Sequence, residues 1–353
     1  MKLCLLTVLF MTGLLFFGCR EHRVDLEIGE NDAPLAFDEY VESVSMIKIA
    51  ETDDMMIADI SKAVMIDDST YIVMDRRQRA LLKMTRGGKI VDKFQRIGRG
   101  PGEYTEIFDF DIDTNNGRLF LLCNRLLSRI MIMDFDFKME RSVDMDDRSL
   151  YQRIAYFEKE WYLYSHDAWT IYKWDEHDMP TPVIQSERSN KGVFFSHVPV
   201  FHKNGNELYV NMGGDDAVYQ MKNGRGERFY TLNWHDKEAG YHIVSQLSPD
   251  DNLRYAKNAP PIIQSLIIDD KKIIIFYSRI NFRMAVADIN TGEILDDGIV
   301  YNVLNNSSPT LNINREPAQF LFIVDSLTNQ NYYNIHYQAS GPYETALVRY
   351  KMK

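Results

Sequence analysis

A short unit of apolar segments and turns recurs along this chain, with a period of about 40 to 50 residues. The clearest copies occupy 71–94, 119–143, 207–232 and 272–299. In the first copy the apolar segments are separated by a small break and by a turn that contains Gly87-Gly88. Repeated small all-β units of this length are typical of a β-propeller. The pattern therefore predicts an all-β architecture before any residue indicates a function.

The number of units is best counted from the second strand of each one. Six candidate strands are centred near Ile72, Phe120, Tyr162, Tyr209, Ile274 and Tyr333. We therefore predict a six-bladed β-propeller of four-stranded antiparallel blades over residues 40–353. Five blades would require one of the weaker units to be an insertion. Seven would require a further unit within 236–264 or 299–325.

The ends of this domain and one long spacing add detail. The last apolar segments, 332–337 and 345–352, leave the final blade without its outermost strand, so we expect 41–49 to supply it and close the ring. The spacing between the fourth and fifth units is unusually long. It contains Ser248-Pro249-Asp250-Asp251, which has the cap, the proline and the acidic residues of a helix start. We expect a short helical insertion at about 240–262.

The N-terminus has the features of an export signal. Lys2 precedes an apolar stretch, 3–17, that is too short and too interrupted for a membrane span. The stretch ends in Gly18-Cys19 and resembles a bacterial lipobox, although Phe16 and Phe17 depart from its commonest residues. We predict a signal peptide at 1–18, lipidation of Cys19, a tether at 19–39 and a place in the cell envelope, at the outer membrane.

Charge and cysteine content exclude other classes of protein. The formal net charge is −11 and the pI about 5.3, so nucleic acid is not an expected partner. The basic run 76–79 is instead expected to be a loop between strands. Cys4 lies in the signal and Cys19 would carry lipid, which leaves Cys123 as a buried thiol with no disulfide partner.

One motif points to a family. Residues 94–104 read Phe-Gln-Arg-Ile-Gly-Arg-Gly-Pro-Gly-Glu-Tyr. Alternate glycines permit positive φ and Pro101 fixes φ, so we expect a tight connection from the outer strand of one blade to the inner strand of the next. The motif resembles that of the six-bladed β-propeller lipoproteins of Bacteroides and its relatives, which have the shape of NHL-repeat propellers. The resemblance implies an exported, lipid-anchored propeller and no defined activity.

Two sets of residues are candidates for ligand binding. Arg99, Glu103 and Tyr104 belong to the glycine-rich loop, where Glu103 is expected either to cap nearby amides or to face the central channel. His166 and Trp169 are expected to be exposed in a loop that follows an aromatic-rich strand. Tyr and Trp suit sugar rings and protein hot spots, although large aromatic residues also pack between blades. The predicted ligand is a glycan or a protein.

A metal site is the alternative. Residues 108–113 alternate, which places Asp109, Asp111 and Asp113 on one face of a strand, where carboxylates could bind Ca²⁺ or simply face water. Some related propellers are calcium-dependent lactonases or esterases with Glu, Asn and Asp ligands that reach the channel from different blades. Candidate ligands here are Glu103, Asp111, Asp113 and Asp215 or Asp216, which do not match that set residue by residue. Among them, Asp111 and Asp113 are the predicted metal-binding residues.

The remaining motifs do not support catalysis. The histidines have no metal-binding spacing, and His202 is expected to be a lone surface or rim residue. No Gly-x-Ser-x-Gly elbow occurs. We therefore predict a binding or scaffold module without a cofactor, and keep a calcium-dependent hydrolase as the alternative.

Overall fold

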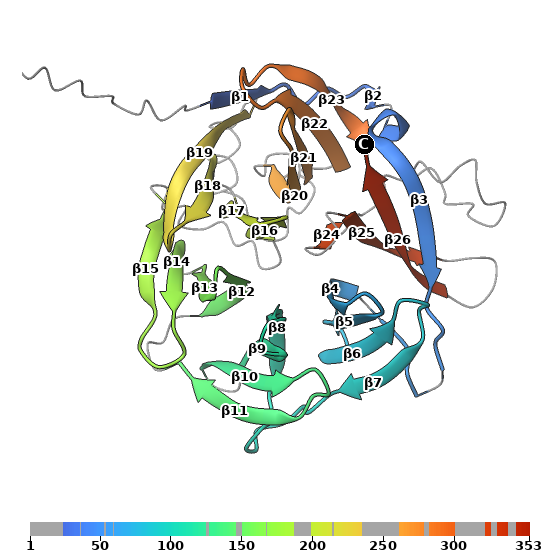
Figure 1. Cartoon of the computed structure of the whole chain (residues 1–353), viewed down its shortest axis with the longest axis vertical. Coiled ribbons are helices and arrows are strands. Elements are labelled where there is room, and N and C mark those ends of the chain that lie inside the picture. The colour runs from blue at the N-terminus through green and yellow to red at the C-terminus, as the bar shows by residue number, and fades with distance from the viewer. Residues whose placement is uncertain are drawn as a thin grey trace, which may run out of the picture.

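The computed structural model describes residues 24–353 except for 36, 53, 59, 125–126, 146–149, 167, 187–198, 214, 235–260, 279–281, 301–321, 326–329 and 338–343. The strands in this part of the chain form six sheets arranged around a common axis (Figure 1). The protein is therefore an all-β propeller. The predicted signal peptide, Cys19 and the helix expected after Ser248 lie outside the described residues.

Each sheet has four antiparallel strands that follow the chain outward from the axis, except that β3 takes the outermost place in the last sheet. Two sheets carry a fifth strand, which pairs parallel. Three sheets hold only strands that follow one another directly: β4 (Ile60–Asp67), β5 (Thr70–Asp75), β6 (Ala80–Thr85) and β7 (Ile90–Phe94); β8 (Glu106–Asp113), β9 (Arg118–Asn124), β10 (Ser128–Asp134) and β11 (Met139–Asp144); β12 (Tyr151–Phe157), β13 (Glu160–Ser165), β14 (Thr170–Trp174) and β15 (Thr181–Gln185). The other three sheets each gain a strand from the N-terminal region: β16 (Phe201–Asn204), β17 (Glu207–Val210), β18 (Ala217–Lys222) and β19 (Arg225–Trp234) with β1 (Val24–Ile28); β20 (Ile262–Ile268), β21 (Lys272–Ser278), β22 (Phe282–Asp288) and β23 (Ile294–Val300) with β2 (Pro34–Leu35); β24 (Phe322–Asp325), β25 (Gln330–Tyr337) and β26 (Glu344–Met352) with β3 (Val41–Lys48).

The strand expected to close the ring is β3. It pairs antiparallel with β26, which covers the outer edge that the last sheet would otherwise expose. The 3₁₀ turn η1 (Phe37–Tyr40) leads into it. No helix within the described part of the chain is long and apolar enough to cross a membrane.

The region predicted to be a tether is partly folded, which corrects its boundary. β1 and β2 run parallel to the outer strands β19 and β23 and extend those sheets by one strand each. The alternation in 24–28 explains this, because Leu26 and Ile28 are buried while Asp25 and Glu27 are exposed. The part of the chain that packs on the propeller therefore begins by Val24, within the expected tether 19–39.

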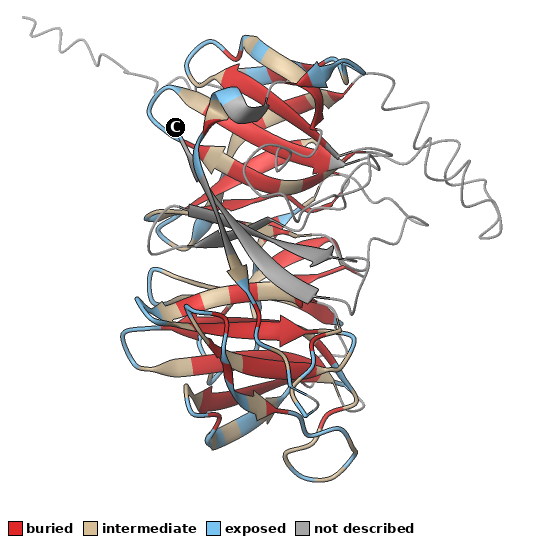
Figure 2. Cartoon of the chain, turned by 90° about the vertical axis from the view of Figure 1, so that its right-hand side faces the viewer, coloured by how far each residue is buried: buried red, intermediate tan, exposed pale blue. Residues whose placement is uncertain are grey.

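The core lies between neighbouring sheets, as Figure 2 shows by the burial of the strands and the exposure of the turns. Apolar residues on facing sheets form separate clusters. The sheet of β8–β11 gives one face to the cluster on each side of it, and so does the sheet of β12–β15. The six anchor residues used to count the units each lie in the second strand of a sheet. Cys123 is buried and unbonded, and burial raises the pKa of its thiol to about 12.

Candidate functional site

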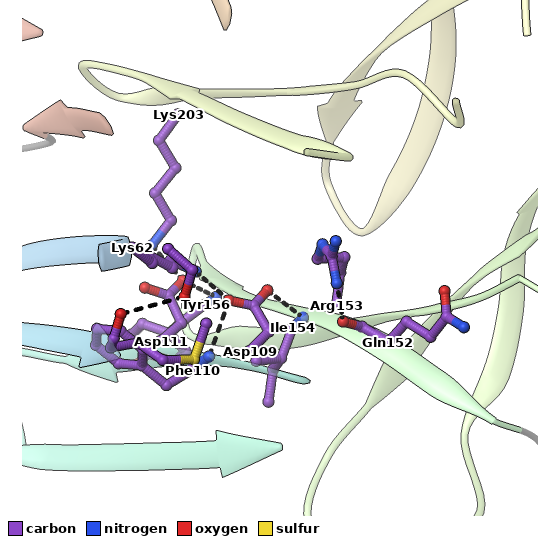
Figure 3. Close-up of polar contacts among 11 residues, drawn as sticks. Lys62, Asp109, Phe110, Asp111, Gln152, Arg153, Ile154, Tyr156 and Lys203 are labelled. Atoms are coloured by element: carbon purple, nitrogen blue, oxygen red, sulfur yellow. Dashed lines mark hydrogen bonds and ion pairs between the residues drawn. The ribbon is translucent and has the colours of Figure 1, made fainter. Parts of the chain in front are cut away.

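The strands nearest the axis carry a cluster of opposite charges. β4, β8, β12 and β16 come first in four of the sheets and surround the axis in Figure 1. They bear Lys62, Asp109 and Asp111, Arg153, and Lys203 respectively. Figure 3 shows Lys62, Asp109, Asp111 and Lys203 meeting from separate strands, with Arg153 to one side of them. We call these five residues the axial cluster. It contains three cations and two carboxylates.

Asp109 is buried and fully engaged. One carboxylate oxygen accepts a hydrogen bond from Lys62 Nζ at 2.8 Å and another from the backbone amide of Phe110 at 2.8 Å. The other oxygen accepts from the backbone amide of Ile154 at 3.0 Å. The side chain of Asp109 therefore ties together three strands, β4, β8 and β12 (Figure 3).

Asp111 repeats this arrangement one step along the strand. Its Oδ2 accepts a hydrogen bond from the Tyr156 amide at 2.7 Å and forms an ion pair with Lys203 Nζ at 2.5 Å. Burial alone would raise the pKa of this carboxyl. The charges of Lys203 and Lys62, with the two hydrogen bonds, outweigh burial and hold the pKa of Asp111 below its usual value.

The two carboxylates cap the inner edge of β12. The amides of Ile154 and Tyr156 are two residues apart, so they point to the same side of the strand. β12 is the innermost strand of its sheet and has β13 on its other side, so these amides have no strand partner. Carboxylates from β8 satisfy them instead, and this joins two sheets close to the axis.

The expected metal ligands are thus committed to protein partners. Asp113 is also buried, and it closes the β8–β9 turn by accepting hydrogen bonds from the amides of Asn115 at 3.1 Å and Asn116 at 3.3 Å. The expectation that the aspartate face is wet is wrong. Within the described residues, no group of three or more His, Cys, Asp or Glu side chains could hold a metal ion.

A bulge alters the predicted alternation of β8. The register with β9 shifts between Ile107 and Asp109, which takes Phe108 off the face of Phe110 and Ile112. Phe108 packs in the cluster towards β12, while Phe110 and Ile112 pack towards β4–β7. The aspartates keep the predicted common face from Asp109 onward.

The glycine-rich loop connects β7 to β8, as predicted. Glu103 caps it from within, since its Oε2 accepts a hydrogen bond from the Gly100 amide at 2.6 Å. Within this loop positive φ occurs at Gly102, at 72°, and not at Gly98 or Gly100. Those two glycines are needed for a different reason, because the Glu103 carboxylate packs directly against them.

Replacing Gly98 with alanine is expected to destabilise the protein by about 1–3 kcal/mol, the cost of leaving a polar group unsatisfied. A Cβ at this position would lie 2.1 Å from Glu103 Oε2, so the carboxylate must leave the Gly100 amide. Chemical denaturation checks this. Gly87→Ala is the matched control, because its Cβ would meet nothing nearer than 3.8 Å, and its effect should stay within about 0.5 kcal/mol.

Three predicted ligand-binding residues are buried instead. Tyr104 is fully buried, and its hydroxyl donates to the Arg79 carbonyl at 2.7 Å, so it anchors the loop to the neighbouring turn. His166 and Trp169 are each 7% exposed and their rings lie 5.1 Å apart. The turn from His166 to Trp169 is tight, with an amide-to-carbonyl bond of 3.2 Å and a positive φ at Trp169, and it folds the indole onto the core. Arg99 is exposed.

His202 is also buried, so its predicted place at the surface is wrong. It lies on β16 beside Lys203 and is 3% exposed, and its Nε2 has no hydrogen-bond partner within the described residues. Burial lowers the pKa of this imidazole to about 3.

This histidine is expected to make stability depend on pH. The folded state keeps it neutral down to about pH 3, whereas the unfolded state protonates it below about 6.5. Its contribution to the free energy of unfolding is therefore complete above pH 6.5 and declines by up to about 1.4 kcal/mol per pH unit below it. In His202→Leu this slope should disappear between pH 6.5 and 4, as measured by denaturation at several pH values. An unchanged slope would contradict a neutral buried imidazole.

The loops at one end of the sheets form a continuous face. In an antiparallel sheet, the turn between the second and third strands lies at the same end as the connection to the next sheet. Hydrogen bonds join neighbouring loops: Gln95 Nε2 to Gln78 O at 2.6 Å, Arg79 Nη1 to Thr105 O at 3.0 Å, Thr105 N to Asn124 O at 2.8 Å, and Met145 N to Ser128 O at 2.9 Å. We call the described residues of 49–59, 76–79, 95–105, 124–128 and 145–150 the loop face.

The sequence did not single out the cations of the axial cluster. Lys62, Arg153 and Lys203 each occupy the third position of an innermost strand. Aligning the repeat units with one another would have revealed a cation at the third position of several first strands. Their carboxylate partners lie 47 and 92 residues away, for Lys62 and Lys203, so no local pattern reveals the pairing.

The fold and this arrangement define a β-propeller whose inner strands are held by buried charge pairs. The chain belongs to the family described as a domain of unknown function, DUF4934, which matches residues 22–347. A solved structure of a candidate exported protein from Bacteroides fragilis NCTC 9343 is similar at a TM-score of 0.63 and 11% identity, covering 93% of this chain and 99% of that one. A DUF4221 family member from Bacteroides vulgatus ATCC 8482 is similar at a TM-score of 0.51 and 8% identity, covering 89% and 97%. These similarities concern the fold, and no curated protein matches the sequence.

Proposed function

We propose that this protein is an exported, lipid-anchored binding or scaffold module of the cell envelope that binds a glycan or a protein through its loop face. In this proposal each of the six sheets is one blade of the propeller. The observation that supports it best is that Asp109 and Asp111 pair with lysines and accept hydrogen bonds from backbone amides. Carboxylates used in this way stabilise a scaffold, and this favours binding over metal-dependent hydrolysis.

The envelope location is supported by the N-terminal sequence, with its apolar stretch before Gly18-Cys19. The export description of the Bacteroides fragilis protein agrees with it. We expect Cys19→Ser to move the protein from the membrane fraction to the soluble fraction of cells, because the lipid would no longer be attached. Immunoblotting of the two fractions measures this. Unchanged fractionation would remove the lipid anchor from the proposal.

A thermal-shift screen of the domain that begins after Arg23 tests ligand binding directly. The probes are plant and host glycans, and Ca²⁺ against a chelator. A ligand at 100 times its Kd should stabilise the folded state by about 2.7 kcal/mol. A shift with a glycan alone supports a sugar-binding module, whereas a shift with Ca²⁺ that a chelator reverses supports the hydrolase. No shift with any probe leaves a protein as the ligand, which is tested below.

A further inference from the structure

A stretch of this acidic chain is strongly basic. Residues 76–106 contain nine Arg or Lys and three Asp or Glu, although the whole chain has a net charge of −11. The arginines of this stretch gather on the loop face, apart from one that lies in another turn. We call Arg76, Arg77, Arg79, Arg96 and Arg99 the arginine patch. Local charge of one sign against a background of the opposite sign marks a surface that attracts a complementary partner.

The patch is continuous because two loops that supply it are joined. Gln95 Nε2 donates to the Gln78 carbonyl at 2.6 Å, and Tyr104 donates to the Arg79 carbonyl at 2.7 Å. These bonds hold the turn 76–79 against the loop 95–105. Residues next to the bonded ones, Arg77 and Arg96, are therefore held on neighbouring loops of a fixed framework.

The fold leaves part of this charge without a partner. Glu103 turns inward to the Gly100 amide, and Glu106 lies 3.6 Å from Arg79. Arg77 and Arg99 are exposed and form no ion pair with any described residue. Glu103 therefore does not neutralise the patch, and Glu106 pairs with Arg79 alone among the patch arginines.

Apolar side chains accompany the arginines. Seven large apolar residues are exposed in the described part of the chain, and Met56, Ile97, Leu127 and Leu150 among them belong to the loop face. Ile97 lies between Arg96 and Arg99 in the sequence and is 42% exposed. Arginine combined with apolar anchors is the composition of a protein–protein hot spot.

The same residues argue against a sugar as the partner. None of the large apolar side chains exposed in the described residues is aromatic, so this surface offers no ring on which a sugar could stack. The patch is also built from arginine, whose planar fork pairs with carboxylates through two hydrogen bonds. We propose that the arginine patch docks an acidic segment of a protein partner, an inference that rests on the proposed function and names its ligand class.

Site-specific photocrosslinking of the full-length protein in intact cells tests the inference. A photoreactive residue at Ile97 should give a crosslinked protein, and mass spectrometry should place the attachment in a segment rich in Asp and Glu. The same residue at Leu295, which is 57% exposed on the outer strand β23, should give no such product. The double variant Arg77→Glu, Arg99→Glu should lower the Ile97 product by at least tenfold.

A second pair of substitutions controls for net charge. Lys138→Glu with Lys271→Glu changes the charge equally, at exposed residues in turns that do not belong to the loop face, and should keep the product. Circular dichroism establishes that both double variants fold. A glycan or lipid attached at Ile97, a product that survives the arginine reversal, or no product at all would each overturn the inference. A glycan shift in the thermal screen would then leave the proposed function standing. If neither a glycan shift nor a protein crosslink is found, the proposed function is refuted as well.

Discussion

Replacing Trp161 with alanine is expected to lower the free energy of unfolding by about 3–5 kcal/mol. Trp161 lies on β13 and is 3% exposed. Its ring centroid is 3.7 Å from that of Phe120, on β9 of the neighbouring sheet, and 4.6 Å from that of Tyr156. The substitution removes one of the two tryptophans buried between these sheets and leaves a cavity that the close-packed strands around it do not fill.

Urea denaturation of the domain that begins after Arg23 measures this loss. Trp161→Phe keeps a ring against Phe120 and should lose less. Leu295→Ala removes an exposed side chain and should change stability by no more than about 0.5 kcal/mol. A loss below about 1 kcal/mol for Trp161→Ala would mean that this contact does not hold the two sheets together.

The fold was predictable because a propeller repeats its signal. Copies of one pattern support one another, so Ile72 and Tyr333 identify second strands even though their neighbouring turns differ. β1 escaped prediction because it is a single strand outside the repeat. Its parallel pairing with β19 depends on a contact about 200 residues away along the chain. The sequence feature that indicates this strand is the alternation in 24–28, with Leu26 and Ile28 on one face.

The site was less predictable, because burial is decided by contacts between distant segments. Period two correctly placed Asp109 and Asp111 on one face, but it could not show that β12 would cover that face. The loop containing Trp169 looked exposed because it separates two strands. Its positive φ at Trp169 and the bond back to His166 fold the indole onto the core, and neither is visible in residue types alone.

Replacing Asp111 with alanine is expected to cost about 3 kcal/mol, since it leaves the partly buried Lys203 ammonium and Tyr156 amide without the buried carboxylate that accepts from both. Lys203→Met should also destabilise, because it leaves the buried carboxylate of Asp111 with fewer partners. The double variant should lose less than the sum of the two, with a coupling of about 0.5–3 kcal/mol. Additive losses, measured by chemical denaturation at neutral pH, would mean that the two side chains do not act as a pair.

The exposed pair Lys83–Asp136 is the matched control. Its atoms are 2.6 Å apart, but the side chain of Asp136 is 82% exposed, so Asp136→Ala should destabilise the protein far less than Asp111→Ala. The contrast separates the effect of burial from the effect of ion pairing as such. Equal losses at Asp136 and Asp111 would show that burial adds nothing.

The pH dependence of a second variant at this position, Asp111→Asn, distinguishes a structural carboxylate from a metal ligand. The pKa of Asp111 is lowered in the folded state, so its contribution to stability is complete above the unfolded value of about 3.9 and is lost as the pH falls through the folded value. The stability difference between the wild type and Asp111→Asn should therefore be constant at neutral pH and vanish in acid, with Ca²⁺ or with a chelator. If Ca²⁺ enlarges the difference at pH 7, or if the substitution abolishes a hydrolase activity, the carboxylate is a metal ligand and the axial cluster is a catalytic site.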